Sequence, residues 1–382
     1  MGGGTAVNIT MLAVGTRGDV EPCVALGQGL ERRGHAVRVV MSRSHAGLVT
    51  GAGLENVPLS YDSRGGDPAA SHSLEALRRL LNEMTDASKG SDLILHTPLG
   101  FAGLSIAERD GIPSRQTMMH PRVPVPAGQA WPKARFHLIG TALGLMCQGT
   151  INRWRREMLG LPSMSARRHA RELRRVPTLF AYSPVLVPPA HRSGARERVT
   201  GPWLLEASSG WRPPDELEAF LKEGPAPVFV AFDQIAVRMP DREHALSSVR
   251  AALRSAGRRG VLSGHGESSD DVLFVPDVPY DWLFGGVAAI VHHGGAGTLL
   301  ATLRAGLPSV VLPSWADQGY WADRADALGC GVSLPDLERL GDALATVLQE
   351  PRFGSRARAL GERIATEDGI GQACDAIEEW AR

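Results

Sequence analysis

The sequence predicts an α/β protein of two domains, each built on a doubly wound parallel sheet, and three observations predict this class. Near-continuous apolar runs, typical of strands buried on both faces, alternate with segments of helical apolar spacing in both halves of the chain. The length of 382 residues exceeds one ordinary core and suits two domains. A stretch rich in proline, glycine and tryptophan, Val187–Pro227, reads as a linker, and we place the boundary near residue 205.

Composition excludes several classes of protein. The chain is 43% hydrophobic and 21% charged, as expected of a soluble globular protein. Lys+Arg and Asp+Glu balance at 41 each, so no global field favours nucleic acid or an anionic membrane. The four cysteines form no C-x-x-C pair, which argues against a metal site or a disulfide framework and fits a reducing cytoplasm. The N-terminus lacks the charged region of a signal peptide, and we expect no transmembrane segment.

The first half opens with a strand, a turn, a helix and a second strand. We expect the strand at Val7–Val14, the turn at Gly15–Asp19 and a helix that starts near Val20, with Pro22 tolerated in its first turn. Ligands of doubly wound sheets bind at the carboxyl ends of the strands, where Asp19 lies. The next elements alternate helix and strand at Ala36–Met41 (strand), Leu74–Met84 (helix), Leu93–His96 (strand), Leu104–Asp110 (helix) and Ser114–Met119 (strand).

Two segments of the first half allow more than one interpretation. Pro121–Pro132 contains four prolines and cannot be regular structure; with Phe136–Cys147 it forms either a ligand-recognition loop or a plain connector. Arg153–Arg175 holds eight arginines against Glu157 and Glu172. Such a run predicts a solvated helical face, and the alternative is contact with an anionic ligand or membrane surface. A steep salt dependence of binding would favour the alternative.

The second half repeats the alternation and contains the most informative stretch, Val287–Tyr320. A strand at Val287–Val291 meets His292 and His293, and three glycines then open a segment of helical spacing. Backbone N–H groups at such a helix N-terminus, together with the helix dipole, attract an anion, so we predict a diphosphate cradle. The other expected elements are Val228–Phe232, Glu243–Ala256, Gly260–Ser263, Val272–Val275, Asp281–Phe284, Ser309–Leu312, Gln318–Leu328, Asp336–Glu350 and C-terminal helical stretches.

The string HHGGAGT at 292–298 and the later Ala-Asp-Gln at 316–318 resemble the donor-binding signature of GT-B glycosyltransferases, especially bacterial enzymes that glycosylate antibiotics. The resemblance implies two Rossmann-like domains that face a central cleft. Residues 1–204 would bind the acceptor and residues 205–365 the nucleotide-sugar donor. Residues 366–382 would form a C-terminal helix that can pack back on the first domain.

The same resemblance implies roles for individual residues in the second half. Asp317 and Gln318 would hydrogen-bond sugar hydroxyls, and the nucleobase would stack near Val275. Trp315 would either line the sugar pocket or pack in the interior, and His292 would either touch the ligand or point into the core. The residues that would hold the diphosphate are His293, Gly295, Ala296, Gly297 and Thr298.

In the first half, Gly15–Pro22 reads GTRGDVEP and resembles the N-terminal motif of antibiotic glycosyltransferases, in which the aspartate is the proposed general base. Asp19 would then accept the acceptor proton. From local sequence alone, a helix N-cap explains this aspartate as well. The neighbouring Thr16, Arg17 and Gly18 are further candidates for donor or acceptor contact.

The resemblance implies an inverting glycosyltransferase that moves a hexose or deoxyhexose from a TDP- or UDP-sugar to a hydroxyl of a natural-product aglycone. We expect no cofactor besides the donor, no metal because the chain lacks an Asp-x-Asp pair, and a monomer or weak dimer. Two departures stand out. Asp233-Gln234 replaces the usual Gly-Ser, and Gly264–Gly266 replaces a nucleobase-contacting pair. The first departure motivates one alternative, a non-catalytic partner of the same fold. The other alternative, a sterol or lipid glucosyltransferase, would be favoured if the arginine-rich segment bound vesicles.

Overall fold

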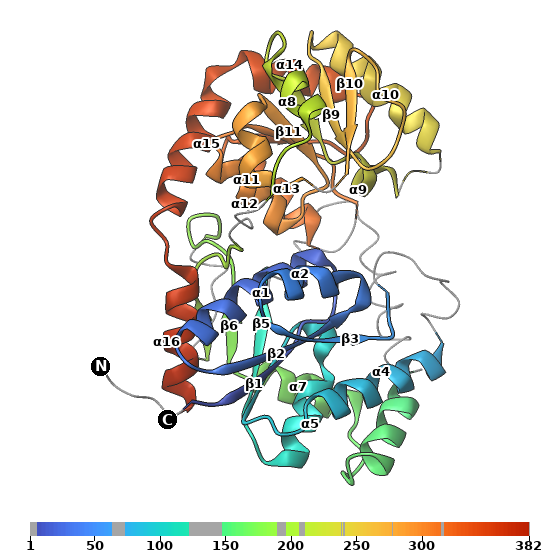
Figure 1. Ribbon diagram of the computed structural model, residues 1–382, viewed down its shortest axis with the longest axis vertical. Coiled ribbons are helices and arrows are strands. Elements are labelled where there is room, and N and C mark those ends of the chain that lie inside the picture. Colours follow the sequence, from blue (N-terminus) through green and yellow to red (C-terminus); the bar gives the residue numbers. More distant parts are fainter. Residues whose placement is uncertain are drawn as a thin grey trace. The chain divides into compact units, whose positions relative to one another are not determined.

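The computed structural model describes residues 6–62, 73–121, 147–188, 196–205, 211–237, 239, 241–276, 278–314 and 317–381. The chain groups into two compact units. Unit 1 comprises Met1–Pro184, Pro189–Glu206 and Asp368–Arg382, and unit 2 comprises Val185–Pro188 and Ala207–Glu367. Each unit contains its own parallel sheet with helices around it, which confirms the predicted fold class (Figure 1).

The sheet of unit 1 has seven parallel strands in the order β3-β2-β1-β4-β5-β6-β7. The order reverses between β1 and β4, the kind of switch point at which parallel sheets bind ligands. The strands are β1 (Asn8–Leu12), β2 (Ala36–Ser42), β3 (Glu55–Leu59), β4 (Leu93–His96), β5 (Ser114–Met118), β6 (Thr178–Phe180) and β7 (Glu197–Val199).

Helices cover both faces of this sheet, so its central strands are buried on both sides. On one face α1 and α16 contribute to an apolar cluster, and on the other face α4, α5 and Trp154 contribute to a second cluster. The helices are α1 (Arg17–Arg32), α2 (Ala46–Gly51), α4 (Leu74–Ala87), α5 (Ala102–Asp110), a helix over 147–157, α7 (Ala166–Arg175) and α16 (Gly369–Ala381).

The sheet of unit 2 has six parallel strands in the order β10-β9-β8-β11-β12-β13. Its strands are β8 (Val228–Val230), β9 (Gly260–Ser263), β10 (Val272–Val275), β11 (Ala289–His292), β12 (Ser309–Val311) and β13 (Gly331–Ser333). Its helices are α8 (Asp215–Lys222), α9 (Phe232–Ala236), α10 (Arg242–Ser255), α11 (Tyr280–Leu283), α12 (Ala296–Arg304), α13 (Gln318–Ala327), α14 (Leu340–Gln349) and α15 (Pro351–Ile364).

Three sequence-based predictions need correction. Helix α1 begins at Arg17 and not near Val20, so Pro22 lies in its second turn. The predicted strand Val228–Phe232 ends at Val230, and a short helix follows it directly. The supposed linker Val187–Pro227 contains β7 and α8, because its few apolar residues pair with the sheet edge or pack on the core of unit 2.

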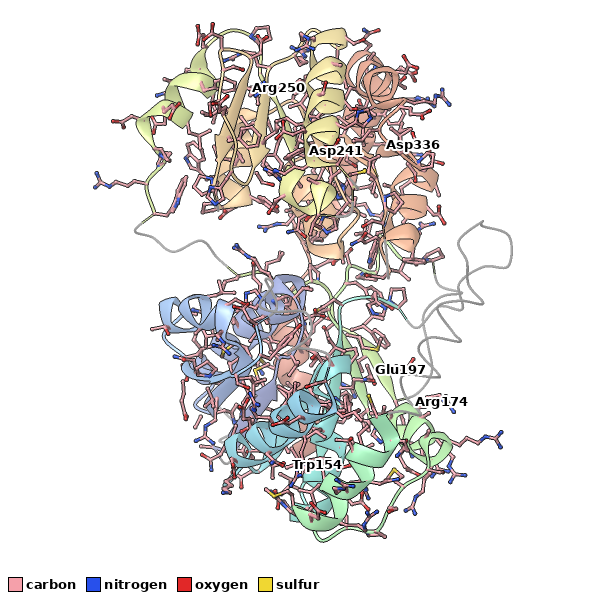
Figure 2. All side chains as sticks on the ribbon, turned by 90° about the vertical axis from the view of Figure 1, so that its right-hand side faces the viewer. Trp154, Arg174, Glu197, Asp241, Arg250 and Asp336 are labelled. Atoms are coloured by element: carbon pink, nitrogen blue, oxygen red, sulfur yellow. The ribbon has the colours of Figure 1, made fainter. Side chains whose placement is uncertain are left out.

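The arginine-rich segment is largely solvated, as predicted, with one exception. Seven of its eight arginines are exposed in the burial pattern, and Arg174 lies at the rim of unit 1 (Figure 2). Arg155, however, is only 1% exposed and donates hydrogen bonds to Ser105 Oγ, Glu108 Oε2 and the Pro162 carbonyl. A buried guanidinium needs such partners because an unpaired buried charge is costly.

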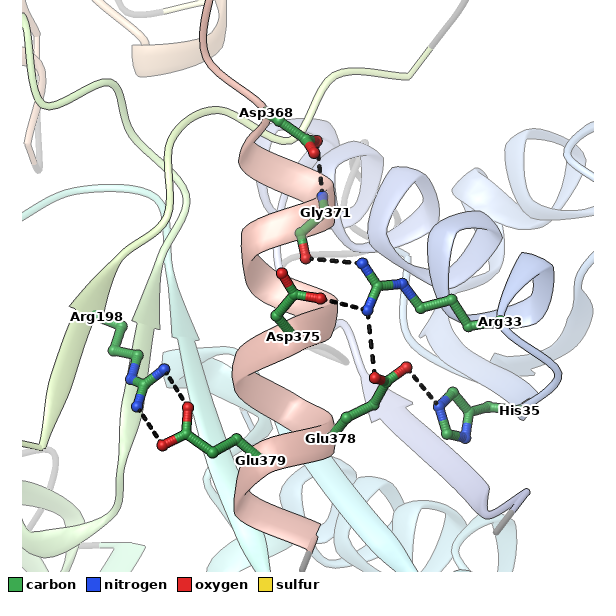
Figure 3. A network of polar contacts seen from close by, with 8 residues as sticks. All are labelled: Arg33, His35, Arg198, Asp368, Gly371, Asp375, Glu378 and Glu379. Atoms are coloured by element: carbon green, nitrogen blue, oxygen red, sulfur yellow. Dashed lines mark hydrogen bonds and ion pairs between the residues drawn. The ribbon is translucent and has the colours of Figure 1, made fainter. Parts of the chain in front are cut away.

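Helix α16 packs on α1 within unit 1, and a polar network lines its flank (Figure 3). Arg33 forms ion pairs with Asp375 at 2.6 Å and Glu378 at 3.3 Å, and Arg198 pairs with Glu379 at 2.7 Å. The guanidinium of Arg33 also donates to the Gly371 carbonyl at 3.1 Å. On the same helix Ala373, Cys374 and Ile377 are buried in the apolar cluster of unit 1, and such burial generally stabilises more than exposed ion pairs do.

The predicted recognition loop falls largely outside the described residues, since 122–146 covers most of Pro121–Pro132 and Phe136–Cys147. Trp315 lies outside them as well. Among the residues that the structure describes, no helix is long and apolar enough to cross a membrane.

Candidate functional site

A bend between β11 and α12 forms the centre of the site in unit 2. Gly294 has φ +90°, a conformation that glycine adopts without strain, and a Cβ there would lie 2.9 Å from the Gln318 carbonyl oxygen. The bend therefore packs directly on the start of α13. A Cβ on Gly295 would lie 2.7 Å from His293 Nε2, so the imidazole of His293 occupies the space that a larger residue would need.

At the N-terminus of α12, no side chain of the described residues forms a capping hydrogen bond. Gly295 is its N-cap and supplies no side chain, and the first hydrogen bond across this end runs from Leu299 N–H to the Gly295 carbonyl at 3.0 Å. The N–H groups of Ala296, Gly297 and Thr298 precede that bond and have no acceptor within the helix. These three N–H groups and the positive end of the helix dipole make this end suited to an anion such as a diphosphate.

The two histidines of the bend have different environments. His292 is the last residue of β11 and fully buried, and its Nδ1 accepts a hydrogen bond from Gly294 N–H at 3.1 Å. Burial, followed by the neighbouring His293, lowers the pKa of His292 to about 3, so it is neutral. The buried imidazole of His292 therefore fixes the backbone of the bend through its hydrogen bond with Gly294. Burial also lowers the pKa of His293, and the carboxylates of Asp233 and Asp317 oppose that shift.

Asp317 and Gln318 lie at the start of α13, and both side chains have partners within the protein. Asp317 Oδ2 accepts from Trp321 Nε1 at 2.8 Å. Gln318 Oε1 accepts from the Ser314 N–H and hydroxyl, both at 2.9 Å. These bonds orient the two side chains, but nothing in the structure tests their predicted role toward a sugar.

The remaining donor-site prediction concerns Val275, the last residue of β10. Its side chain is 3% exposed and belongs to an apolar cluster of unit 2, and its carbonyl accepts from Gly264 N–H at 2.9 Å. The side chain of Val275 therefore faces the interior, and only its backbone lies at the strand end where a base would stack. The role of Val275 toward the nucleobase stays a prediction.

In unit 1, the predicted base Asp19 is the third residue of α1 and not its N-cap. Its Oδ2 accepts from the Thr16 N–H at 2.8 Å and the Thr16 hydroxyl at 3.0 Å, which forms the N3 half of a capping box. Gly15 has φ +148°, and a Cβ there would lie 2.3 Å from Asp19 Oδ2. The first turn of α1 thus contains its own carboxylate, whereas the first turn of α12 contains no acidic residue.

Arg17 and Gly18 occupy the first turn of the same helix. Arg17 Nε forms an exposed ion pair with Glu21 Oε2 at 2.7 Å, one turn along α1, and both Arg17 and Gly18 are exposed. Such an i,i+4 pair stabilises a helix weakly and leaves the guanidinium at the surface.

Sequence reasoning missed the residues that support the site. Ser263, at the end of β9, donates to Asp233 Oδ1, while Ser314 and Trp321 hold Gln318 and Asp317. The spacing of Ser314 to Gln318 and of Asp317 to Trp321 is four residues, which could have signalled the two local pairs. The pair of Ser263 and Asp233 joins the end of β9 to the helix that follows β8, and residues so far apart in the chain give no local signal.

Comparisons with known proteins place the chain in a family. Residues 9–125 match the model of the glycosyltransferase family 28 N-terminal domain, and residues 259–371 match that of the erythromycin biosynthesis protein CIII-like C-terminal domain. The chain is 33% identical to O-mycaminosyltylonolide 6-deoxyallosyltransferase of Streptomyces fradiae, with 98% of each chain covered.

Two further comparisons extend this result. A sterol 3-beta-glucosyltransferase of Cryptococcus neoformans is 30% identical over 97% of this chain, but the chain spans only 27% of that relative's length. The fold is similar to that of the glycosyltransferase SsfS6 of Streptomyces sp. SF2575 in complex with thymidine diphosphate, with a TM-score of 0.65, 22% identity and coverage of 98% and 99%. The chain therefore belongs to the family of GT-B glycosyltransferases that includes the bacterial antibiotic glycosyltransferases.

Proposed function

We propose that the chain transfers a hexose or deoxyhexose from a TDP- or UDP-sugar to a hydroxyl of a natural-product aglycone, with inversion at the anomeric carbon. The uncapped N-terminus of α12 beside His293 is the observation that carries the proposal, because it offers three aligned N–H donors where a leaving diphosphate needs its charge stabilised. The relative from Streptomyces fradiae, an allosyltransferase by name, supports the substrate class.

In this proposal each unit supplies one part of the chemistry. The acceptor oxygen attacks the anomeric carbon and gives its proton to Asp19, while the bond from that carbon to the diphosphate oxygen breaks. The hydrogen bonds from Thr16 fix the orientation of the Asp19 carboxylate, so positioning is part of its contribution. Asp317 and Gln318 would hold sugar hydroxyls from the start of α13.

The first test is nucleotide binding. TDP, UDP and GDP are titrated while the melting temperature is followed, and a nucleotide at 100 times its dissociation constant stabilises the protein by about 2.7 kcal/mol. We expect a shift with TDP or UDP that survives EDTA, in line with a metal-independent donor site. No shift with any nucleotide would favour the non-catalytic alternative.

The second test is turnover of Asp19→Asn. Asn can still accept the Thr16 N–H bond but cannot take a proton, so release of nucleotide diphosphate in the presence of an aglycone should fall by about 10²–10⁴-fold. Binding of TDP and the melting temperature should stay close to those of the native protein. Unchanged turnover would remove Asp19 from the mechanism.

A sterol glucosyltransferase is the second candidate. The similarity to the Cryptococcus neoformans enzyme and the seven exposed arginines of Arg153–Arg175 favour it. Turnover of UDP-glucose with sterols, together with sedimentation on vesicles of anionic phospholipid, separates the candidates. Sterol glucosylation without turnover of any macrolide aglycone would replace the first proposal.

A further inference from the structure

Asp233 follows β8 at the carboxyl edge of the unit 2 sheet, as the second residue of α9. The hydroxyl of Ser263, at the end of the neighbouring strand β9, donates to Asp233 Oδ1. The next residue, Gly264, has φ +103°, and a Cβ there would lie 3.1 Å from Asp233 Cβ. The loop after β9 therefore lies against Asp233 and holds its carboxylate at this edge.

His293 and Asp233 follow neighbouring strands of the unit 2 sheet. Strands β8 and β11 are neighbours, Val230 is paired with Val291, and Ala231 N–H donates to the Val291 carbonyl at 2.9 Å. Adjacent strands lie about 4.8 Å apart, so the segments that carry Asp233 and His293 leave the sheet from neighbouring strands at the same edge.

The electrostatic effects on His293 agree with this geometry. Burial lowers its pKa, and among the carboxylates that raise it Asp233 comes first and Asp317, from α13, second. The other titratable neighbour, His292 on β11, is buried and neutral because its pKa is lowered to about 3. Of the two carboxylates that favour a charged His293, Asp233 thus has the larger effect.

A carboxylate at this place opposes the binding of a diphosphate, because like charges repel. A neutral imidazole adds one hydrogen bond but no positive charge. An imidazolium offsets the carboxylate and donates to the phosphate as well, and charge-assisted hydrogen bonds are about twice as strong as neutral ones. The N–H groups of Ala296, Gly297 and Thr298 supply only partial charges at the start of α12.

We propose that Asp233 and His293 act as a pair: when a nucleotide diphosphate binds, His293 takes up one proton from the solvent and is held as an imidazolium between the Asp233 carboxylate and the phosphate oxygens. Asp233 is then a positioning residue of the donor site, and donor binding weakens as the pH rises. The inference rests on the proposed binding of a nucleotide sugar by unit 2.

Calorimetric titration of TDP into the full chain tests the pair. Titrations in buffers of different ionisation enthalpy, with EDTA, between pH 7.0 and 8.5 give the number of protons taken up. For the native protein we expect a net uptake of protons when TDP binds. The affinity for TDP should then fall by up to about tenfold for each unit by which the pH rises. Asp233→Asn should lose at least half of that uptake and show a flatter pH profile. Any change in protonation of the TDP phosphates is the same for all variants, so it cancels when the variants are compared.

His293→Gln and Asp270→Asn complete the experiment. Gln keeps a hydrogen-bond donor but cannot be protonated, so His293→Gln should show the flattest profile. Asp270 is an exposed carboxylate of unit 2, and its replacement should leave uptake and affinity as in the native protein.

The possible results separate two failures. Equal proton uptake in the native protein and Asp233→Asn, or TDP binding that takes up no proton, would overturn the pairing while leaving donor binding intact. Absence of TDP and UDP binding in every variant, the native chain included, would overturn the proposed function instead.

Discussion

At the scale of single residues, Gly295 permits the position of His293. A Cβ would lie 2.7 Å from His293 Nε2, closer than real Cβ contacts allow, so Gly295→Ala must displace the imidazole. We expect TDP affinity to fall at least about tenfold, the loss of roughly one charge-assisted hydrogen bond. Calorimetry measures this, with Gly354→Ala in α15 as the control, because beyond its chain neighbours and its own helix backbone no described atom lies within 4 Å of a Cβ there. Equal affinity of the two variants would contradict the role of Gly295.

His292 gives the stability of the protein a defined pH dependence. Its folded-state pKa of about 3 lies below the ordinary 6.5, so the unfolded chain binds an extra proton between these values. Stability from this group is complete above pH 6.5 and falls as the pH decreases, by about 1.4 kcal/mol per unit. His292→Asn keeps an acceptor for the Gly294 N–H and removes the titration. Urea unfolding at pH 7 and 5 should show a smaller acid loss in the variant, and equal losses would argue against a neutral His292.

At the scale of secondary structure elements, the helix over 147–157 carries one structural arginine among exposed ones. Arg155→Ala removes hydrogen bonds to Ser105, Glu108 and Pro162 and leaves a cavity, so we expect a loss of about 2–4 kcal/mol in the free energy of unfolding. Arg153→Ala, on the exposed face of the same helix, should change it by less than about 0.5 kcal/mol. Chemical denaturation of both variants checks this, and similar values would contradict the burial of Arg155.

Helix α16 approaches α1 closely at Gly29. A Cβ on Gly29 would lie 2.4 Å from Ile370 Cγ2, so Gly29→Ala should destabilise by about 1–3 kcal/mol through overpacking. Ile370→Ala removes the clashing methyl group, and the double variant should be more stable than the sum of the single changes predicts, by about 1 kcal/mol. A double-mutant cycle measured by thermal unfolding gives this coupling. Strict additivity would mean that the two helices do not meet at this point.

At the scale of the whole molecule, the alternation of apolar strands and helices was enough to predict two parallel sheets. Strands such as β1 and β4 are buried on both faces, and their continuous apolar runs are visible in the sequence. The three-residue strands β6 and β13 were missed, because they are too short for any periodicity and form only by pairing with a neighbour. The start of α1 was misplaced because the Thr16 and Asp19 capping box was overlooked.

One part of the candidate site could be predicted from the sequence, and another part could not. Glycine and histidine chemistry at 292–298 predicted an uncapped helix start, because backbone donors at such a turn follow from local sequence. The hydrogen bond from Ser263 to Asp233, by contrast, brings together residues 30 positions apart in the chain. The local sequence pattern does not predict such contacts, because they depend on strand order and side-chain packing.

The most direct test of the account is a crystal structure of the chain with TDP. We predict that the diphosphate oxygens lie within hydrogen-bond distance of the N–H groups of Ala296, Gly297 and Thr298, with His293 beside them. A nucleotide bound elsewhere, or a diphosphate that leaves the start of α12 unoccupied, would contradict the central claim that this helix end holds the donor.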